Sequence, residues 1–413
     1  MDSLRLIITL SLKLNFNIIQ LDIKSAYLNA NLNEEIYMKA PQGHEDYENK
    51  IWKLNRAIYG LKQSGREWNN TLNNTLKGIG FENLKCDPCI YIRKDINENI
   101  ICIIAIYVDD IIVAGNNENI QTVKDSIKSN FETKDLGNID FIIGIKFSKI
   151  NDNIYINQKG YINEILKKYE MTNSKTTNNL LPIKNEEFRK EPFNPTLYRG
   201  AIGSLLYIAI HTRPDILFAV TKAARYSTEP NLENWHNVLK IFKYLKYTIN
   251  YSIKFTNNFN IKAYVDADYA GDEESRRSTS GYIITIGNSP ICWSSKLQHC
   301  VATSTAEAEY YSLSECGKQV LWLKNILSEI GINTGTITIY IDNKAAIFSS
   351  ENNVINNKLK HIDIRYHFIR ELINNKTIKL EYIKSSENLA DGLTKFLNGT
   401  RLQKFRDSVL NKI

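Results

Sequence analysis

The sequence contains no apolar stretch long enough to cross a membrane. The longest one, from Ile100 to Val108, has nine residues, about half a transmembrane span, and it ends at two aspartates. The N-terminal segment carries Asp2, Arg5 and Lys13 among its apolar residues, and it lacks a small-residue cleavage site. We therefore expect neither a signal peptide nor a membrane partner.

Cysteine is scarce and scattered: the six residues are spread from Cys86 to Cys316. This spacing argues against a disulfide framework and favours a reducing compartment. Cys86 and Cys89 form a CxxC pair, but no second pair of cysteines or histidines completes a zinc site. We expect no metal at this pair.

The sequence also lacks a strong excess of either charge: it has 52 Lys and Arg and 45 Asp and Glu, which gives a net charge of +7. A modest basic excess suits a polyanionic partner without identifying one. The 413 residues, 43% hydrophobic and 23% charged, are typical of a folded globular chain of two to three domains. The length and composition exclude a single small binding module and a disordered chain.

The order of elements divides the chain. Helix-like and strand-like stretches alternate over the first 171 residues, ending in a helical pattern at 161–169. Residues 172–195 are rich in Asn, Thr and Pro without an apolar period, which indicates a linker. From Ile261 the pattern predicts strand, strand, strand, long helix, strand, helix, helix, strand, helix, an α/β domain with a boundary near residue 255.

Two helices are predicted between the linker and this domain. The first begins at Thr212-Arg-Pro-Asp215, where Thr can cap, Pro fits the first turn and Asp suits the positive helix end. The second places five apolar residues on one face, namely Trp235, Val238, Leu239, Phe242 and Leu245.

Two aspartates lie at the tip of a predicted hairpin. Asp109 and Asp110 separate the β-rich runs 100–108 and 111–115. Asp22 ends another apolar run, so it meets Asp109 at one edge if the two strands are neighbours. Aspartate also favours turns in general, which leaves a purely structural role open. Converging carboxylates repel one another unless Mg²⁺ neutralises them, and a pair of such ions serves in-line phosphoryl displacement.

These segments resemble reverse transcriptases. Tyr107-Val-Asp-Asp110 is similar to their YxDD motif, residues 21–29 are similar to their first palm motif, and residues 54–68 are similar to the LYGLKQ block of copia-type retrotransposons. The resemblance implies that Asp22, Asp109 and Asp110 are the polymerase carboxylates, with Asp22 and Asp109 as metal ligands.

The same resemblance implies roles at the nucleotide. Tyr27 stands where reverse transcriptases keep the aromatic gate against a ribose 2′-OH, and Tyr107 belongs to the YxDD motif. Gln63 and Arg66 would lie near the incoming nucleotide or the template, unless they are merely an exposed polar pair on a loop.

The C-terminal region offers a second set of carboxylates. Asp266 and Asp342 each end a predicted strand, at the edge where α/β sheets place ligands. Glu307 fits a capping box with Ser304, whereas Glu309 continues the apolar stripe of its helix and so faces the sheet. A carboxylate there is costly without a partner such as a metal, which favours Glu309. Asp391 lies at the start of a later helix.

An acidic set on strand, helix, strand and helix resembles the DEDD site of RNase H, in its copia-type version. The resemblance implies that Asp266, Glu309, Asp342 and Asp391 hold metal for hydrolysis of RNA in a hybrid. Asp268 is a second-choice ligand or a turn former. His361 and His367, on the preceding helix, are interpreted as structural or as facing nucleic acid.

The expected fold class is α+β and α/β, and the resemblance divides it into four segments. They are a reverse-transcriptase palm and thumb-like region (1–171), a linker with connection helices (172–255), an RNase H-like α/β domain (256–398) and a C-terminal tail (399–413). Met1 falls just before the first palm motif, so we expect a palm with its fingers mostly missing. The loop 384–391 has no histidine, so the proton shuttle of many RNases H is expected to be absent.

Three hypotheses follow. The first is a copia-type reverse transcriptase with RNase H, using two Mg²⁺ per site, or Mn²⁺, and acting on an RNA template, a DNA primer, dNTPs and the hybrid. The second keeps only the hybrid-specific nuclease, and the third is a non-catalytic remnant that binds nucleic acid. No protease or integrase motif occurs, so the chain resembles part of a Pol polyprotein, expected in cytoplasmic virus-like particles or the nucleus.

Overall fold

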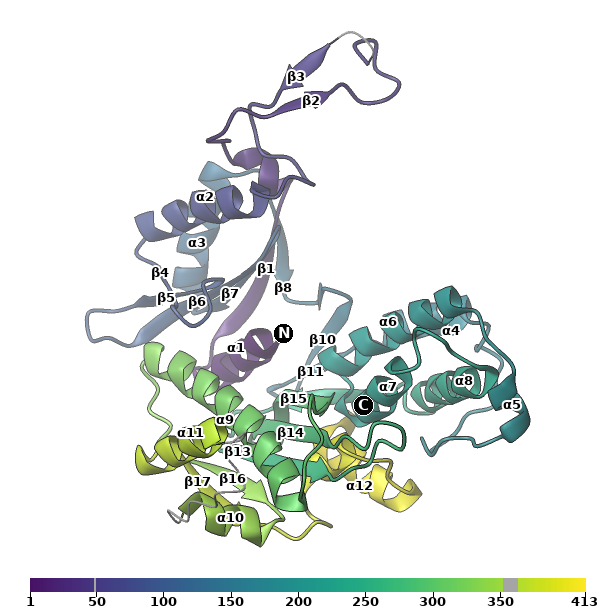
Figure 1. Ribbon diagram of the computed structural model, residues 1–413. Coiled ribbons are helices and arrows are strands. Elements are labelled where there is room, and N and C mark those ends of the chain that lie inside the picture. The colour runs from purple at the N-terminus through teal and green to yellow at the C-terminus, as the bar shows by residue number, and fades with distance from the viewer. Residues whose placement is uncertain (48–49, 352–362) are drawn as a thin grey trace. The chain divides into compact units, whose positions relative to one another are not determined.

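The computed structural model describes residues 1–47, 50–351 and 363–413 (Figure 1). It forms two compact units. The smaller unit contains Leu14–Ile139 and Glu329–Ile332, and the larger unit contains Met1–Lys13, Asp140–Ser328 and Asn333–Ile413. The domain boundaries expected from the sequence stay a prediction.

The smaller unit is built on an antiparallel sheet with the strand order β4-β5-β6-β7-β1-β8. Apolar side chains of β1, β6 and β7 form one core with residues of α2 and α3, so both helices pack on the same face of the sheet. The opposite face carries the alternate residues of β1, including Gln20 and Asp22. The elements of this unit are β1 (Asn17–Ile23), η1 (Ala26–Asn29), β2 (Tyr37–Lys39), β3 (Ile51–Lys53), α2 (Ser64–Gly78), β4 (Glu82–Asn83), β5 (Ile90–Lys94), β6 (Ile100–Tyr107), β7 (Asp110–Gly115), α3 (Asn117–Asn130) and β8 (Thr133–Asn138).

The predicted hairpin is confirmed. β6 and β7 pair antiparallel with Tyr107 opposite Asp110, and the isoleucine-rich run gives β6 the branched side chains that strands favour. β7 also pairs with β1, which makes the strand that carries Asp22 a direct neighbour of the hairpin.

The larger unit contains a mixed sheet with the order β15-β14-β13-β16-β17. β13, β14 and β15 are antiparallel, whereas β16 runs parallel to β13 and β17 runs parallel to β16. The predicted order of elements after Ile261 is confirmed, with α9 as the long helix. The elements of this unit are α1 (Asp2–Lys13), β9 (Phe141–Ile142), β10 (Ile145–Ile150), β11 (Asn153–Asn157), α4 (Lys159–Lys168), α5 (Glu186–Lys190), α6 (Pro195–His211), η2 (Pro214–Ile216), α7 (Leu217–Ala224), α8 (Leu232–Tyr247), β12 (Tyr251–Phe255), β13 (Ile261–Asp268), β14 (Thr279–Ile286), β15 (Ser289–Leu297), α9 (Thr305–Glu329), β16 (Ile337–Ile341), α10 (Lys344–Glu351), α11 (Asp363–Asn374), β17 (Ile378–Tyr382), η4 (Leu389–Leu393), α12 (Gly399–Val409) and β18 (Asn411–Lys412).

A second sheet of this unit, with the order β18-β12-β11-β10-β9, precedes the mixed sheet along the chain except for its last strand. The N-terminal helix α1 is anchored by Arg5, which is buried and donates to the carbonyl oxygens of Ile291, Ile210 and His211 at 2.7, 3.1 and 2.9 Å. The Arg5 guanidinium also lies 3.8 Å from the ring centroid of Trp293. These bonds tie α1 to β15 and α6.

The helix predicted to begin at Thr212-Arg-Pro-Asp215 is confirmed: η2 begins at Pro214 with Asp215 in its first turn, and α7 follows at Leu217. The predicted cap is wrong, because Thr212 follows the end of α6 (Pro195–His211) and its hydroxyl donates to Gln158 Oε1 at 2.7 Å. Asp215 accepts from the neighbouring buried Arg213 guanidinium at 2.7 and 2.8 Å and from the Tyr244 hydroxyl at 2.9 Å. The predicted second helix is confirmed as α8. Residues 172–194 are irregular as predicted except for the five-residue helix α5, and their role as a linker stays a prediction.

Within the described part of the chain, none of the helices combines the length and apolar composition that crossing a bilayer requires. The six cysteines are all free thiols.

Candidate active sites

The strand pairing of the smaller unit gathers three aspartates, which we call the hairpin site: Asp22, Asp109 and Asp110. Asp22 on β1 lies directly opposite Asp110 on β7. Asp109 occupies the turn between β6 and β7, and its backbone carbonyl accepts a hydrogen bond from the amide of Ile23 at 2.9 Å. The register of two neighbouring strand pairs therefore determines this site.

Each hairpin aspartate at the turn has a neutral hydrogen-bond donor. Gln20 Nε2 donates to Asp110 Oδ1 at 2.7 Å, and the Tyr59 hydroxyl donates to Asp109 Oδ2 at 2.7 Å. Asp109 Oδ1 is buried without a hydrogen-bond partner among the described residues. Burial raises the pKa of Asp110, and the charges of Asp22 and Asp109 raise it further against the Gln20 bond. Burial, followed by the bond to Asp109, raises the pKa of Tyr59 to about 12.

The turn that presents Asp109 is strained. Val108 adopts φ +55°, a left-handed conformation that is unfavourable for a β-branched residue. Its carbonyl accepts from the indole N–H of the buried Trp68 at 2.8 Å, which holds the turn in place from α2. Strain of this kind persists where surrounding contacts fix the backbone, and it is common at functional sites.

The four residues predicted to contact the nucleotide or the template have different neighbours in the structure. Tyr27 stacks at a tilt against Tyr59, with ring centroids 4.4 Å apart, so it adjoins the partner of Asp109. Tyr107 is exposed at the end of β6. Gln63 and Arg66 instead contact Glu34, each at 3.4 Å, and Arg66 also pairs with Glu67 at 3.2 Å.

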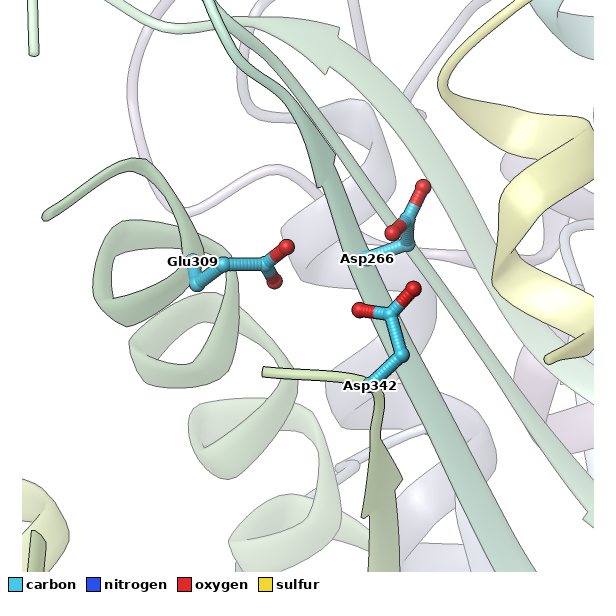
Figure 2. A group of neighbouring side chains, drawn as sticks. All are labelled: Asp266, Glu309 and Asp342. Carbon is cyan, nitrogen blue, oxygen red and sulfur yellow. The ribbon is translucent and has the colours of Figure 1, made fainter. Parts of the chain in front are cut away.

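Three carboxylates converge in the larger unit, and we call them the edge site: Asp266, Glu309 and Asp342. Asp266 belongs to β13, Asp342 follows β16 and Glu309 lies near the start of α9. Figure 2 shows Glu309 reaching from its helix toward the two aspartates. Each residue offers an oxygen, and these oxygens all lie within 4.8 Å of one another. In the described part of the chain, the hairpin aspartates do not form such a group.

Asp266 and Glu309 of the edge site are buried, and Asp342 is half-buried. Burial raises the pKa of Asp266 to about 6, with the charges of Asp342 and Asp391 adding to it while Lys395 and Thr394 oppose it. Burial also raises the pKa of Glu309, and Asp266 and Asp342 raise it further. Glu309 Oε2 has no hydrogen-bond partner among the described residues. An all-oxygen donor set with an unsatisfied buried oxygen fits a hard divalent cation such as Mg²⁺.

Asp391 lies near the edge site, but its carboxylate pairs with a lysine. It is buried on η4 and forms an ion pair with Lys395. In the same turn, the buried hydroxyl of Thr394 donates to Asp266 Oδ2. Ser385 donates to Asp342 Oδ2. Each carboxylate therefore has a polar neighbour from the C-terminal segment, except Glu309.

The start of α9 separates the two glutamates. Glu307 Oε2 accepts from the amide and the hydroxyl of Thr303 at 2.7 and 2.6 Å, and its own amide donates to Ser304 Oγ at 3.2 Å. Glu307 therefore caps the helix, while Glu309 faces the sheet. Asp268, two residues after Asp266, packs against the backbone of Gly271, where an added Cβ would lie 1.7 Å from Asp268 Oδ2.

His367 is exposed on α11, and His361 lies outside the described residues.

Sequence reasoning assigned no role to Tyr59, Trp68, Ser385, Thr394 or Lys395. Tyr59 and Trp68 belong to the LYGLKQ block, and the other three follow β17. For Tyr59 and Trp68, membership of the LYGLKQ block could have indicated a role. The partners of Tyr59, Trp68, Ser385 and Thr394 lie 40 or more positions away in the sequence, so short-range patterns do not identify them. Lys395 pairs with the nearby Asp391.

Comparison with known proteins places the chain in a family. Residues 1–184 match the model described as reverse transcriptase (RNA-dependent DNA polymerase). The chain is 36% identical to the retrovirus-related Pol polyprotein from transposon TNT 1-94 of Nicotiana tabacum, over 99% of this chain and 32% of that one. It is 31% identical to a Ty5-1 transposon protein of Saccharomyces cerevisiae, over 71% of this chain and 98% of that one.

The chain therefore belongs to the Pol polyproteins of copia-type retrotransposons. It spans about a third of the length of the TNT 1-94 and RE1 polyproteins, the latter from Arabidopsis thaliana and 34% identical over 98% of this chain. A solved RNase H1 structure, LC11-RNase H1, covers 35% of this chain and 96% of its own, at 17% identity and a TM-score of 0.27. The match to the reverse transcriptase model ends at residue 184, before the mixed sheet whose strands carry the edge site.

Proposed function

We propose that this chain is an RNA-directed DNA polymerase that also cleaves the RNA strand of RNA/DNA hybrids. The edge site carries the nuclease part of the proposal, because Asp266, Glu309 and Asp342 come from three separate segments and bring three oxygens within reach of one cation. A buried cluster of like charges is costly without such a cation, and membership in a Pol family connects it to nucleic acid. The match of residues 1–184 to the reverse transcriptase model supports the polymerase part.

In the nuclease half, Asp266, Glu309, Asp342 and Asp391 are the proposed metal-site residues. A bound Mg²⁺ or Mn²⁺ supplies neutralisation of the phosphate and activation of water for hydrolysis. Thr394 and Ser385 orient Asp266 and Asp342 through their hydroxyl groups. Recognition of the hybrid would come from 2′-OH and phosphate contacts.

In the polymerase half, the palm would place Asp22 and Asp109 as metal ligands and Asp110 beside them, with two ions expected. Tyr59 holds the carboxylate of Asp109, and Tyr27, packed against Tyr59, is proposed to reject a ribose 2′-OH. Tyr107, Gln63 and Arg66 are proposed contacts of the nucleotide or the template. The partners are an RNA template, a DNA primer and dNTPs, within a longer Pol polyprotein.

A second candidate function is nuclease activity alone. It is favoured by one difference: the edge carboxylates form a three-ligand group, whereas the described hairpin carboxylates do not.

The test uses the purified chain with Mg²⁺ and a labelled RNA/DNA hybrid, measuring dNTP incorporation and RNA cleavage in parallel. Asp109→Asn should abolish incorporation alone, and Asp342→Asn should abolish cleavage alone. Asp125→Asn and Asp152→Asn, at exposed positions of the smaller and larger unit, are the matched controls and should change neither.

Cleavage without incorporation would establish the nuclease-only function. Silence in both assays, from a folded protein, would contradict both functions and leave a nucleic-acid-binding remnant.

A further inference from the structure

Tyr59 contacts both Tyr27 and one of the hairpin aspartates. Its ring stacks at a tilt on Tyr27, with centroids 4.4 Å apart, and its hydroxyl donates to Asp109 Oδ2 at 2.7 Å. One side chain thus joins the residue proposed to reject a ribose 2′-OH to a proposed metal ligand. Asp109 Oδ1 has no hydrogen-bond partner among the described residues, so the contact with Tyr59 leaves this oxygen for another ligand.

The backbone segments that carry the two tyrosines are bonded to each other and to a helix. The amide of Ala57 donates to the carbonyl of Ala30, the residue after η1, at 3.0 Å. The hydroxyl of the buried Ser64, at the start of α2, donates to the carbonyl of Ile58 at 2.6 Å. The segment just before Tyr59 is therefore tied to η1 and to α2, and these bonds set the position at which the two rings meet.

A ring that rejects an added hydroxyl group by steric overlap must be unable to turn away from it. Tyr27 is partly buried and packs against the core of the smaller unit on one side. The Tyr59 ring covers another side of Tyr27, and the hydroxyl bond to Asp109 keeps the Tyr59 ring there. Without the Tyr59 ring, Tyr27 would gain space into which it can turn.

We propose that Tyr59 is a positioning residue for sugar selection in the polymerase half, because its ring holds Tyr27 in place. Discrimination between dNTPs and rNTPs then depends on both rings, whereas the Tyr59 hydroxyl affects the rate with both nucleotides alike. This inference rests on the proposed polymerase function and adds a specificity-determining residue to it.

The test measures kcat/KM for dGTP and for GTP with the full-length chain, Mg²⁺ and a DNA primer on an RNA template. The ratio of the two values is the sugar discrimination. Tyr59→Leu should lower this ratio about tenfold, because Tyr27 loses the ring that holds it. Tyr59→Phe keeps the ring, so it should retain the ratio while incorporation of both nucleotides falls equally. Since Tyr59 is 52% exposed, these replacements should cost little unfolding free energy.

Two further comparisons separate this role from a general disturbance. Tyr37→Leu, at an exposed tyrosine of the same unit bonded to Glu35, should retain both the ratio and the rate. Tyr27→Val should lower the ratio by itself. Tyr27→Val combined with Tyr59→Leu should lower it no further, because Tyr59 acts through Tyr27.

An unchanged ratio in a folded Tyr59→Leu chain would overturn the inference, as would an equal loss of discrimination in Tyr59→Phe or additive losses in the double variant. If Tyr59→Leu does not fold, Tyr59→Met, which also lacks a ring, decides in its place. Incorporation by the unchanged chain together with an unaltered ratio in Tyr59→Leu counts against the inference alone. Absence of incorporation by the folded unchanged chain would contradict the polymerase function and the inference together.

Discussion

The hairpin carboxylates of the smaller unit come from two adjacent strands and a turn, whereas the edge carboxylates of the larger unit come from a strand, a strand end and a helix. The first group is half-buried and has neutral donors, Tyr59 and Gln20. In the second group, Asp266 and Glu309 are almost fully buried, and the neighbouring turn carries a lysine.

This difference shows two ways of placing like charges together. Strand register keeps the hairpin aspartates close while leaving them access to water, so the repulsion is moderated by solvent. Burial in the edge site makes each unpaired charge costly, so the site depends more strongly on a cation. The predictions below test this contrast.

The largest effect, a loss of hybrid cleavage, is expected for substitution of Glu309 on α9. Glu309→Gln should lower hybrid cleavage about 1,000-fold and leave dNTP incorporation unchanged, because only one of the two sites loses a ligand. It should also raise the stability of the metal-free chain, since a buried charge is removed.

Glu307→Gln is the matched control, two residues away. It should retain cleavage and cost about 1 kcal/mol of unfolding free energy, because it weakens the helix cap. Equal loss of cleavage in both variants would contradict the separation of capping from metal binding.

Acid should destabilise the larger unit through one histidine, His211. Burial lowers the pKa of His211 from 6.5 to about 4, with the nearby charge of Arg5 adding to it. The unfolded chain binds this proton first, so the stabilisation is full above pH 6.5 and is lost as the pH falls toward 4. At pH 5 part of this stabilisation is lost, by less than the full pKa shift implies, because the ring is only partly buried and solvent screens it.

Denaturant unfolding at pH 7.5 and pH 5, followed for each unit, measures this loss. On going from pH 7.5 to pH 5, His211→Asn should lose less unfolding free energy than the unchanged chain, or gain more, whereas His44→Asn, at the exposed histidine of the smaller unit, should match the unchanged chain. The raised pKa values of Asp266 and Glu309 favour proton uptake by the folded state and add the same gain to every variant. The same pH sensitivity in the unchanged chain and His211→Asn would show that other groups cause it.

The smallest effect is expected at the hydroxyl of Tyr59. Tyr59→Phe removes the hydrogen bond to Asp109 but keeps the ring against Tyr27, so dNTP incorporation should fall about fivefold, or about 1 kcal/mol. Tyr37→Phe, at an exposed tyrosine bonded to Glu35, is the control. A comparable loss of cleavage in Tyr59→Phe would contradict a role confined to the hairpin site.

The local pattern of the sequence was sufficient for much of the fold. Branched side chains and turn residues identified the hairpin of Asp109 and Asp110, and helical spacing distinguished Glu309 from Glu307. The apolar spacing of Tyr198, Ile202, Leu205 and Ile208 also carried a signal for α6, which was missed. The local preference of Thr212-Arg-Pro-Asp215 for a helix start was correct, but the hydroxyl of Thr212 bonds to the distant Gln158 and does not cap the helix.

The sequence by itself determined the family, the order of elements after Ile261 and the residue types of both carboxylate groups, because these depend on motifs and short-range periodicity. Only the tertiary structure decided which charges meet. The pairing of Asp391 with Lys395, the bond from Thr394 to Asp266 and the bond from Tyr59 to Asp109 depend on how turns and strands pack. Burial, which sets the pKa of Asp266 and Glu309, arises in the same way from segments far apart in the chain.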